Sequence, residues 1–185
     1  MQATPQTVYP LGSITKTVTA AAALRLAELG DLDLDAPIQE SCPAFPEKGH
    51  PITARQLLAH VAGIRHYDYR RFDEDLLNKK SYATLEDAMG KFSEDPLVAE
   101  PGSQYHYSSW GYVVLVCAIE GASDLSYAEA IQRDVLKPAG MESTRLDEVQ
   151  DIIPRRARGY SLLDDGSWGN SGCFDASDRY PQAAW

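Results

Sequence analysis

The run from Thr17 to Leu29 (TVTAAAALRLAEL) constrains the fold of this chain most strongly. Four successive alanines, with leucines and a valine around them, place apolar side chains over most of its circumference when the run is wound as a helix. A helix that is apolar on nearly all sides is usually buried. The sequence therefore predicts a long, buried helix near the start of the chain.

Ser13 and Lys16 stand three residues apart where this helix begins. Residues i and i+3 lie on one face of a helix, so the Lys16 amine can reach the Ser13 hydroxyl. A serine hydroxyl is a weak nucleophile and needs a base of this kind beside it. Burial and the positive end of the helix dipole disfavour the charged amine, which favours a neutral Lys16. The alternative is a helix cap, since serine is common at helix starts and about one S-x-x-K pair is expected by chance.

The charge balance excludes one class of partner. Seventeen basic residues against twenty-seven acidic ones give a net charge of −10, which repels phosphate backbones. No run approaches the ~18 consecutive apolar residues of a membrane span, and the first residues lack the pattern of an export signal. We expect a single soluble domain over residues 1–185, with no nucleic-acid partner and no membrane span.

The three cysteines, Cys42, Cys117 and Cys173, are widely spaced and odd in number. They form no C-x-x-C pair, and no histidine lies near them at zinc-site spacing. Cys117 stands within the apolar run VVLVCAI, as a small core residue would. The sequence therefore predicts unpaired thiols, no metal site and no cofactor.

Most of the remaining elements are expected to be helical. Capping residues or turn signals predict further helices over 54–63, 85–94, 113–122 and 127–140, with Thr84 and Ser126 as caps and the third helix buried. Gly30 suits the end of the first helix. Residues 159–170 alternate around an Asp-Gly turn, which is typical of a hairpin. Little else in the sequence favours strands.

Three ordered blocks of the sequence resemble one enzyme superfamily. They run over 7–38 (TVYPLGSITK to DLDLDAPI), 52–67 (ITARQLLAHVAGIRHY) and 100–144 (EPGSQYHYSSWGY to KPAGMEST). Together they resemble the serine β-lactamase and penicillin-binding-protein superfamily, within it the class C-like branch. The segments FPEK (45–48) and GIRHY (63–67) are most similar to the mitochondrial-type serine β-lactamase-like proteins and their bacterial relatives.

The resemblance implies roles for four residues. Ser13 would be the acylated nucleophile, Lys16 its base, and Tyr107 the tyrosine that faces the nucleophile and relays protons. A phenol beside an ammonium shifts towards phenolate, so Lys16 and Tyr107 would titrate together. Without the resemblance, Tyr107 would be interpreted as an aromatic packing residue. Ser109 stands where many relatives carry an asparagine that binds the substrate carbonyl and the lysine, and its hydroxyl is a shorter substitute.

Four further residues have alternative interpretations. Trp110 either lines the substrate cleft or packs in the core. His60 and His66 could be a metal pair or a triad base, but no carboxylate stands at zinc-ligand spacing, and the resemblance assigns such a histidine to a structural loop. Arg65 is interpreted as a loop anchor.

The superfamily fold has a helical lobe and an antiparallel sheet flanked by helices, with the nucleophile between them. This sequence matches the helical lobe, whereas the two strands that precede the Thr7 segment in relatives and the later K-T-G or H-x-G triplet are not found in it. The second donor to the oxyanion lies beside that triplet in the family, and loss of one such donor typically costs on the order of 10² to 10³ in rate. We therefore expect an α+β, mostly helical fold that lacks much of the antiparallel sheet and is partial at both ends.

The resemblance implies a serine hydrolase that acts on a small-molecule amide or ester through a Ser13 acyl-enzyme. A β-lactam, a D-amino-acid peptide and a small ester are all candidate substrates. The alternative is an inactive or truncated module for binding or assembly, because a partly uncovered first helix would favour a homo-oligomer. A helical domain with coincidental motifs would require several independent ordered matches.

Overall fold

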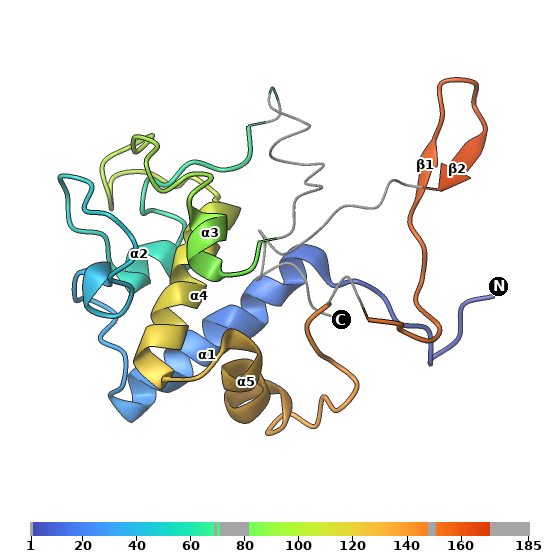
Figure 1. Ribbon diagram of the computed structural model, residues 1–185, viewed down its shortest axis with the longest axis horizontal. Coiled ribbons are helices and arrows are strands. Elements are labelled where there is room, and N and C mark those ends of the chain that lie inside the picture. The colour runs from blue at the N-terminus through green and yellow to red at the C-terminus, as the bar shows by residue number, and fades with distance from the viewer. Residues whose placement is uncertain (1, 69, 71–81, 148–150, 171–185) are drawn as a thin grey trace.

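One central helix organises the helical part of the molecule. The computed structural model describes residues 2–68, 70, 82–147 and 151–170. In it, α4 (Ser109–Ser123) lies between the other helices (Figure 1). The helices that pack against it are α1 (Thr15–Leu29), α2 (Ala54–Leu58), α3 (Leu85–Met89) and α5 (Tyr127–Ile131). Short 3-10 turns occur at Gly12–Ile14 and Ile38–Glu40, and a π-helical turn at Gln132–Leu136 continues α5.

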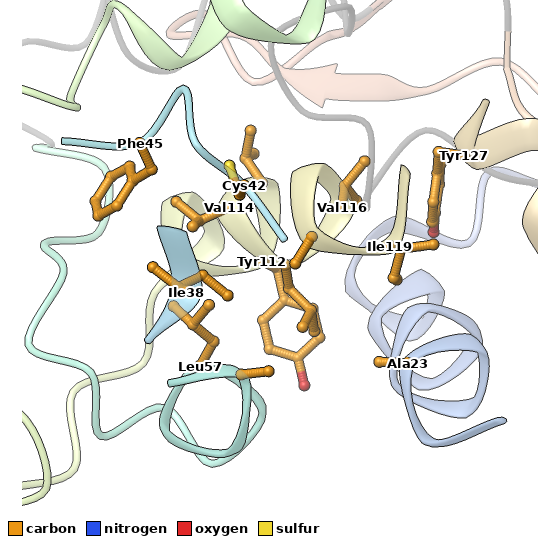
Figure 2. Packing of buried hydrophobic residues seen from close by; sticks show 14 of the residues in the cluster. Ala23, Ile38, Cys42, Phe45, Leu57, Tyr112, Val114, Val116, Ile119 and Tyr127 are labelled. Atoms are coloured by element: carbon orange, nitrogen blue, oxygen red, sulfur yellow. The ribbon is translucent and has the colours of Figure 1, made fainter. Parts of the chain in front are cut away.

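The composition of α4 explains its central place. Every residue from Ser109 to Ile119 except Cys117 is buried. Because its side chains are apolar around the whole circumference, α4 needs neighbours on every side. Figure 2 shows its Tyr112, Val114 and Ile119 among side chains of the surrounding elements. The buried helix predicted over 113–122 is thus confirmed, and it begins four residues earlier than expected.

Side-chain caps mark the beginnings of α2, α3 and α5. The Thr53 side chain accepts from the Gln56 N–H, and the Ser126 side chain accepts from the Glu129 N–H, each within a reciprocal capping box. The Thr84 side chain accepts from the Asp87 N–H. These helix starts are confirmed.

The helix ends were predicted less well. The expected helix over 54–63 ends at Leu58, because His60 adopts a left-handed backbone conformation with φ of 57°. Likewise α3 ends at Met89 and the α-helical part of α5 at Ile131, both short of the predicted ends. Gly30 ends α1 in the left-handed conformation, as predicted.

The prediction of unpaired thiols was wrong for two of the three cysteines. Cys42 and Cys117 form a disulfide, with their Cα atoms 5.4 Å apart and a sequence separation of 75. The bond ties α4 to the loop after the Ile38–Glu40 turn. Gly121 permits this close approach, since a Cβ at this position would collide with the Ser41 carbonyl. Cys173 lies outside the described residues.

The predicted hairpin is confirmed. β1 (Tyr160–Leu162) and β2 (Trp168–Asn170) pair antiparallel, with Leu162 opposite Trp168, and Gly166 turns the chain with φ of 79°. The hairpin projects from the helical part (Figure 1) and forms the only sheet among the described residues. The described part is therefore an α+β helical lobe, as predicted. Within it, every helix falls short of the length or apolar character that crossing a membrane requires.

Replacing Cys42 and Cys117 by alanine will lower the free energy of unfolding by about 2–5 kcal/mol, because the bond restricts the unfolded chain over a long loop. Urea unfolding of the native and double-variant proteins measures this difference. The native protein with its disulfides reduced is the control and should unfold at the lower urea concentration of the double variant. Three titratable thiols in the unreduced native protein would contradict the prediction.

Candidate active site

Ser13 lies at the exposed beginning of α1. It sits in the 3-10 turn Gly12–Ile14, which runs directly into the helix, and Gly12 enters this turn with φ of 53°. No side chain caps this turn or α1, so the Ser13 hydroxyl is not used as a cap. Lys16, one turn further, is buried, and its Nζ donates to Ser13 Oγ over 3.4 Å. The spacing of the pair thus produces the contact expected from the sequence.

The beginning of α4 supplies the other polar groups of the site. Ser108 caps α4, with Tyr107 just before it and Ser109 just inside the helix. The Tyr107 hydroxyl donates to Ser13 Oγ over 2.9 Å, and Lys16 Nζ donates to Ser109 Oγ over 3.2 Å. The structure therefore brings Ser13, Lys16, Tyr107 and Ser109 together from two helix beginnings that lie more than 90 residues apart in sequence.

Burial controls the charge of Lys16. It lowers the pKa of the Lys16 amine below its ordinary value of 10.5, while the hydrogen bond and the negative charge that Tyr107 can carry raise this pKa in part. The amine also lies over the rings of Tyr107 and Tyr112, 5.2 and 5.6 Å from their centroids, where the π-electrons attract a cation. Lys16 is thus a buried amine whose neighbours only partly compensate for its lost hydration.

The phenol of Tyr107 shifts towards its ionised form. Burial raises the pKa of Tyr107, but hydrogen bonds with Ser13 and Lys16, the Lys16 charge and a hydrogen bond with Ser109 outweigh it, so this pKa falls below 10.0. A lysine and a tyrosine whose pKa values both fall can share one proton between them. Such a pair can take a proton from the Ser13 hydroxyl and return it to a leaving group.

Trp110 lies in the core and not beside Ser13. Its side chain is fully buried, stacks on Phe92 with centroids 4.9 Å apart, and meets the Tyr67 ring edge to face at 4.8 Å. A residue with no exposed surface cannot line an open cleft. Of the two interpretations, the geometry favours packing.

The two histidines hold the beginning of α4. His60 Nδ1 accepts from the Ser108 N–H over 3.1 Å, and His66 Nδ1 accepts from the Ser109 N–H over 3.2 Å. The described residues contain no cluster of three His, Cys, Asp or Glu side chains suited to a metal ion. The histidines were noticed in the sequence, but nothing in it indicated that they bind these backbone groups.

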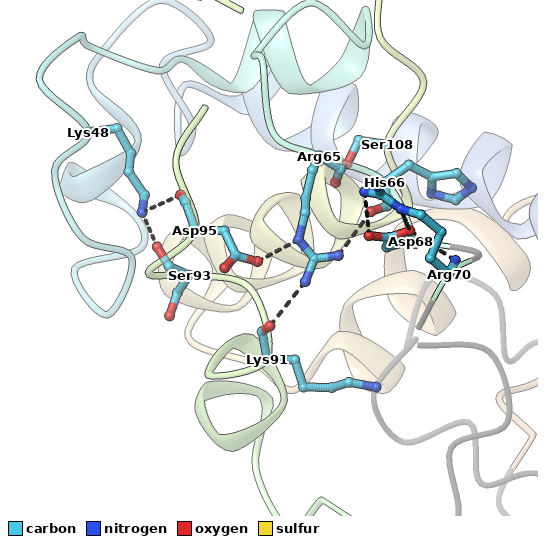
Figure 3. Close-up of polar contacts among 9 residues, drawn as sticks. All are labelled: Lys48, Arg65, His66, Asp68, Arg70, Lys91, Ser93, Asp95 and Ser108. Atoms are coloured by element: carbon cyan, nitrogen blue, oxygen red, sulfur yellow. Dashed lines mark hydrogen bonds and ion pairs between the residues drawn. The ribbon is translucent and has the colours of Figure 1, made fainter. Parts of the chain in front are cut away.

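Arg65 anchors its loop, as interpreted from the sequence. Figure 3 shows its guanidinium bound to the Asp95 carboxylate and to the Lys91 carbonyl. The Arg65 carbonyl accepts from the Ser108 hydroxyl over 2.7 Å, and Ser108 in turn caps α4. Arg65 therefore links the loop directly after α2 both to residues 91–95 and to the start of α4.

Comparisons with known proteins find similar sequences and similar folds. The Beta-lactamase family model matches residues 1–183. The human mitochondrial serine beta-lactamase-like protein LACTB is 28% identical over 84% of this chain and 40% of its own length. A penicillin-binding protein from Bacillus halodurans superposes with a TM-score of 0.77, at 27% identity over 96% of this chain and 52% of its own.

A third similar protein is the octameric penicillin-binding protein homologue of Pyrococcus abyssi. It is 30% identical, with a TM-score of 0.78, over 98% of this chain and 42% of its own. This chain thus spans about 40% of the human relative and about half or less of these solved structures.

Replacing Tyr107 by phenylalanine will lower the pKa of Lys16 further, because Tyr107 supplies the two interactions that raise it. In the native protein, Lys16 should already titrate at lower pH than lysine in a short unstructured peptide. Reductive ¹³C-methylation of the lysines, followed by an NMR titration, measures both values. Assignment by Lys16→Met identifies the signal. A Lys16 signal that titrates with the peptide, or that moves to higher pH in Tyr107→Phe, would contradict the burial argument.

Proposed function

The chain belongs to the Beta-lactamase family, and from this premise we propose that it is a serine hydrolase in which a small amide or ester acylates Ser13. One observation carries the proposal. Ser13 Oγ lies within hydrogen-bonding distance of both Lys16 Nζ and the Tyr107 hydroxyl. A weak alcohol nucleophile with two adjacent proton acceptors of lowered pKa is the arrangement that acyl transfer requires.

In the proposed first step, the Lys16 and Tyr107 pair removes the proton of Ser13. The oxygen attacks the carbonyl carbon of the substrate, and the carbonyl oxygen takes up the negative charge. The Ser13 N–H at the beginning of the helix is one donor for this oxyanion, supported by the positive end of the helix dipole. When the intermediate collapses, the bond to the leaving amine or alcohol breaks, and the pair returns the proton to the leaving group.

In the second step, the same pair takes a proton from a water molecule. The resulting hydroxide attacks the Ser13 ester, the carboxylic acid product leaves, and Ser13 regains its proton. Ser109 has a supporting part, because its hydroxyl accepts from Lys16 and keeps the amine directed into the site. One cycle consumes one substrate molecule and one water, and it releases the carboxylic acid and the amine or alcohol.

A fluorophosphonate probe or a fluorescent penicillin should attach covalently to Ser13, and Ser13→Ala should abolish the attachment. The Lys16→Met variant should slow attachment by about 10² to 10⁴, the usual contribution of a positioned base. Intact-protein and peptide mass spectrometry measure the rate and locate the adduct. Attachment tests only the first step, so it remains informative where complete turnover is slow.

Matched variants guard against indirect effects. Ser103→Ala replaces an exposed serine in the loop before Tyr107, and Lys137→Met replaces an exposed lysine. Both should react at the native rate. No adduct on a folded native chain, or an adduct that persists in Ser13→Ala, would refute the proposed function.

The alternative function, assembly without catalysis, is supported by the outer face of α1. Ile14, Thr17, Ala21 and Leu24 are exposed and follow one another at helical spacing, and Ile14 and Leu24 retain 63% and 51% of their surface. An exposed row of this kind, apolar except for Thr17, favours association with a partner surface. The homologue from Pyrococcus abyssi is octameric, which favours a second copy of this chain as the partner.

On this alternative, the chain should associate reversibly, and Leu24→Glu should yield a monomer because it buries a charge in the contact. Sedimentation velocity over a range of concentrations measures the effect. Arg25→Gln, which alters an adjacent polar residue of α1, is the control and should associate as the native chain does. A native chain that stays monomeric throughout would exclude self-assembly through this face.

A further inference from the structure

His60 is hydrogen-bonded to the residues on both sides of Tyr107 in the sequence. The His106 N–H donates to the His60 carbonyl over 2.8 Å, and the Ser108 N–H donates to His60 Nδ1 over 3.1 Å. These donors belong to the residues immediately before and after Tyr107. His60 therefore fixes the backbone immediately before and immediately after Tyr107.

The imidazole also touches the phenol ring itself. The ring centroids of His60 and Tyr107 lie 4.4 Å apart at an interplanar angle of 38°. On the same imidazole, the Tyr112 ring lies at 4.9 Å and the Tyr105 ring meets it edge to face at 5.9 Å. The plane of the Tyr107 ring is thus determined by packing, and its hydroxyl by the hydrogen bond to Ser13.

His60 makes these contacts from a strained backbone. Its φ of 57° is uncommon for a residue with a side chain, and such a conformation persists only where the surroundings determine it. It ends the helical path of α2 and turns both the carbonyl and the ring of His60 towards residues 106–108. A helix continued through this position would satisfy the local backbone but lose the contacts with Tyr107.

We propose that His60 is a positioning residue that fixes Tyr107 against Ser13 and Lys16, and that it does so only as a neutral imidazole with its proton on Nε2. The kinetic consequence rests on the proposed function, because it concerns acylation of Ser13. The structural consequence, the position and titration of the Tyr107 phenol, does not.

The charge requirement follows from the hydrogen bond. Nδ1 can accept from the Ser108 N–H only while its lone pair is free, and a protonated imidazole has no acceptor. The titratable groups that face the ring are Lys16 from α1, Tyr105 and Tyr107 from the segment before α4, and Tyr112 from α4 itself. Burial, and then the Lys16 charge, lower the pKa of His60 to about 4, so the ring stays neutral near pH 7.

Two substitutions distinguish the effect of the imidazole ring from the effect of its hydrogen bond. His60→Ala removes both the ring and the hydrogen bond. In His60→Asn, an uncharged amide oxygen takes the place of Nδ1, and asparagine also tolerates a positive φ. His60→Ala should slow attachment of the fluorophosphonate to Ser13 on the order of 10²-fold, since displacement of a reacting group by about 1 Å has that effect. His60→Asn should recover most of the rate, and His50→Ala, which removes an exposed histidine, should leave it unchanged.

The titration of Tyr107 gives a readout that needs no activity. With ¹³Cζ-labelled tyrosine, the pKa of Tyr107 should rise in His60→Ala, because the phenol loses its hydrogen bonds with Ser13 and Lys16. It should stay near the native value in His60→Asn. The ¹⁵N shifts of the native His60 ring at pH 7 should show the neutral form with the proton on Nε2.

The outcomes distinguish the two proposals. If the native chain is not labelled at Ser13, the proposed function fails, and a Tyr107 pKa that rises in His60→Ala but not in His60→Asn still supports positioning. An unchanged Tyr107 pKa in folded His60→Ala overturns positioning, even where Ser13 reacts. If His60→Ala does not fold, the native ¹⁵N shifts decide, because a charged ring or a proton on Nδ1 also overturns it.

Discussion

The burial of α4 on all sides is the constraint on which the rest of the structure depends. A helix with an apolar surface all round must be enclosed, and α1 is one of the four helices that enclose it. Ala22 and Ala23 of α1 are fully buried, and such small side chains permit a close approach of two helices. Because the two helices begin near each other, Lys16 reaches Ser109 across the contact. The site is thus formed by the same packing that forms the core.

This arrangement buries the Lys16 amine, so the charged form loses hydration free energy. The surroundings of Lys16 offset only part of that loss. The Ser13 and Ser109 hydroxyls accept its protons, the Tyr107 phenol is a further hydrogen-bond partner, and two aromatic rings face it, but no carboxylate is bound to it among the described residues. A carboxylate would stabilise the ammonium and raise the pKa of Lys16. Hydroxyl groups and rings hold the amine in place without fixing its charge. For this reason the residue remains able to exchange a proton with Tyr107.

Sequence patterns predicted local features of the structure better than they predicted contacts between distant segments. The Ser13–Lys16 spacing, the caps at Thr84 and Ser126 and the hairpin turn depend on residues within a few positions of one another, and they appear as expected. The Cys42–Cys117 disulfide joins residues 75 apart, and the bonds from His60 and His66 to the start of α4 span more than 40. No local pattern encodes such pairs. Tyr107 and Ser109 were placed by resemblance, not by chemistry that the residues alone display.

The beginning of α1 bears on both proposed functions, hydrolysis and association. Ile14 is the first residue of the exposed apolar row, and it directly follows Ser13, which is itself exposed. Adjacent residues of a helical turn point in different directions, so the Ser13 hydroxyl contacts Lys16 and Tyr107 while the Ile14 side chain is exposed to solvent. The proposed hydrolysis and the proposed association would therefore use different sides of the same helix, and a partner on the outer face would leave the contacts of Ser13 with Lys16 and Tyr107 in place.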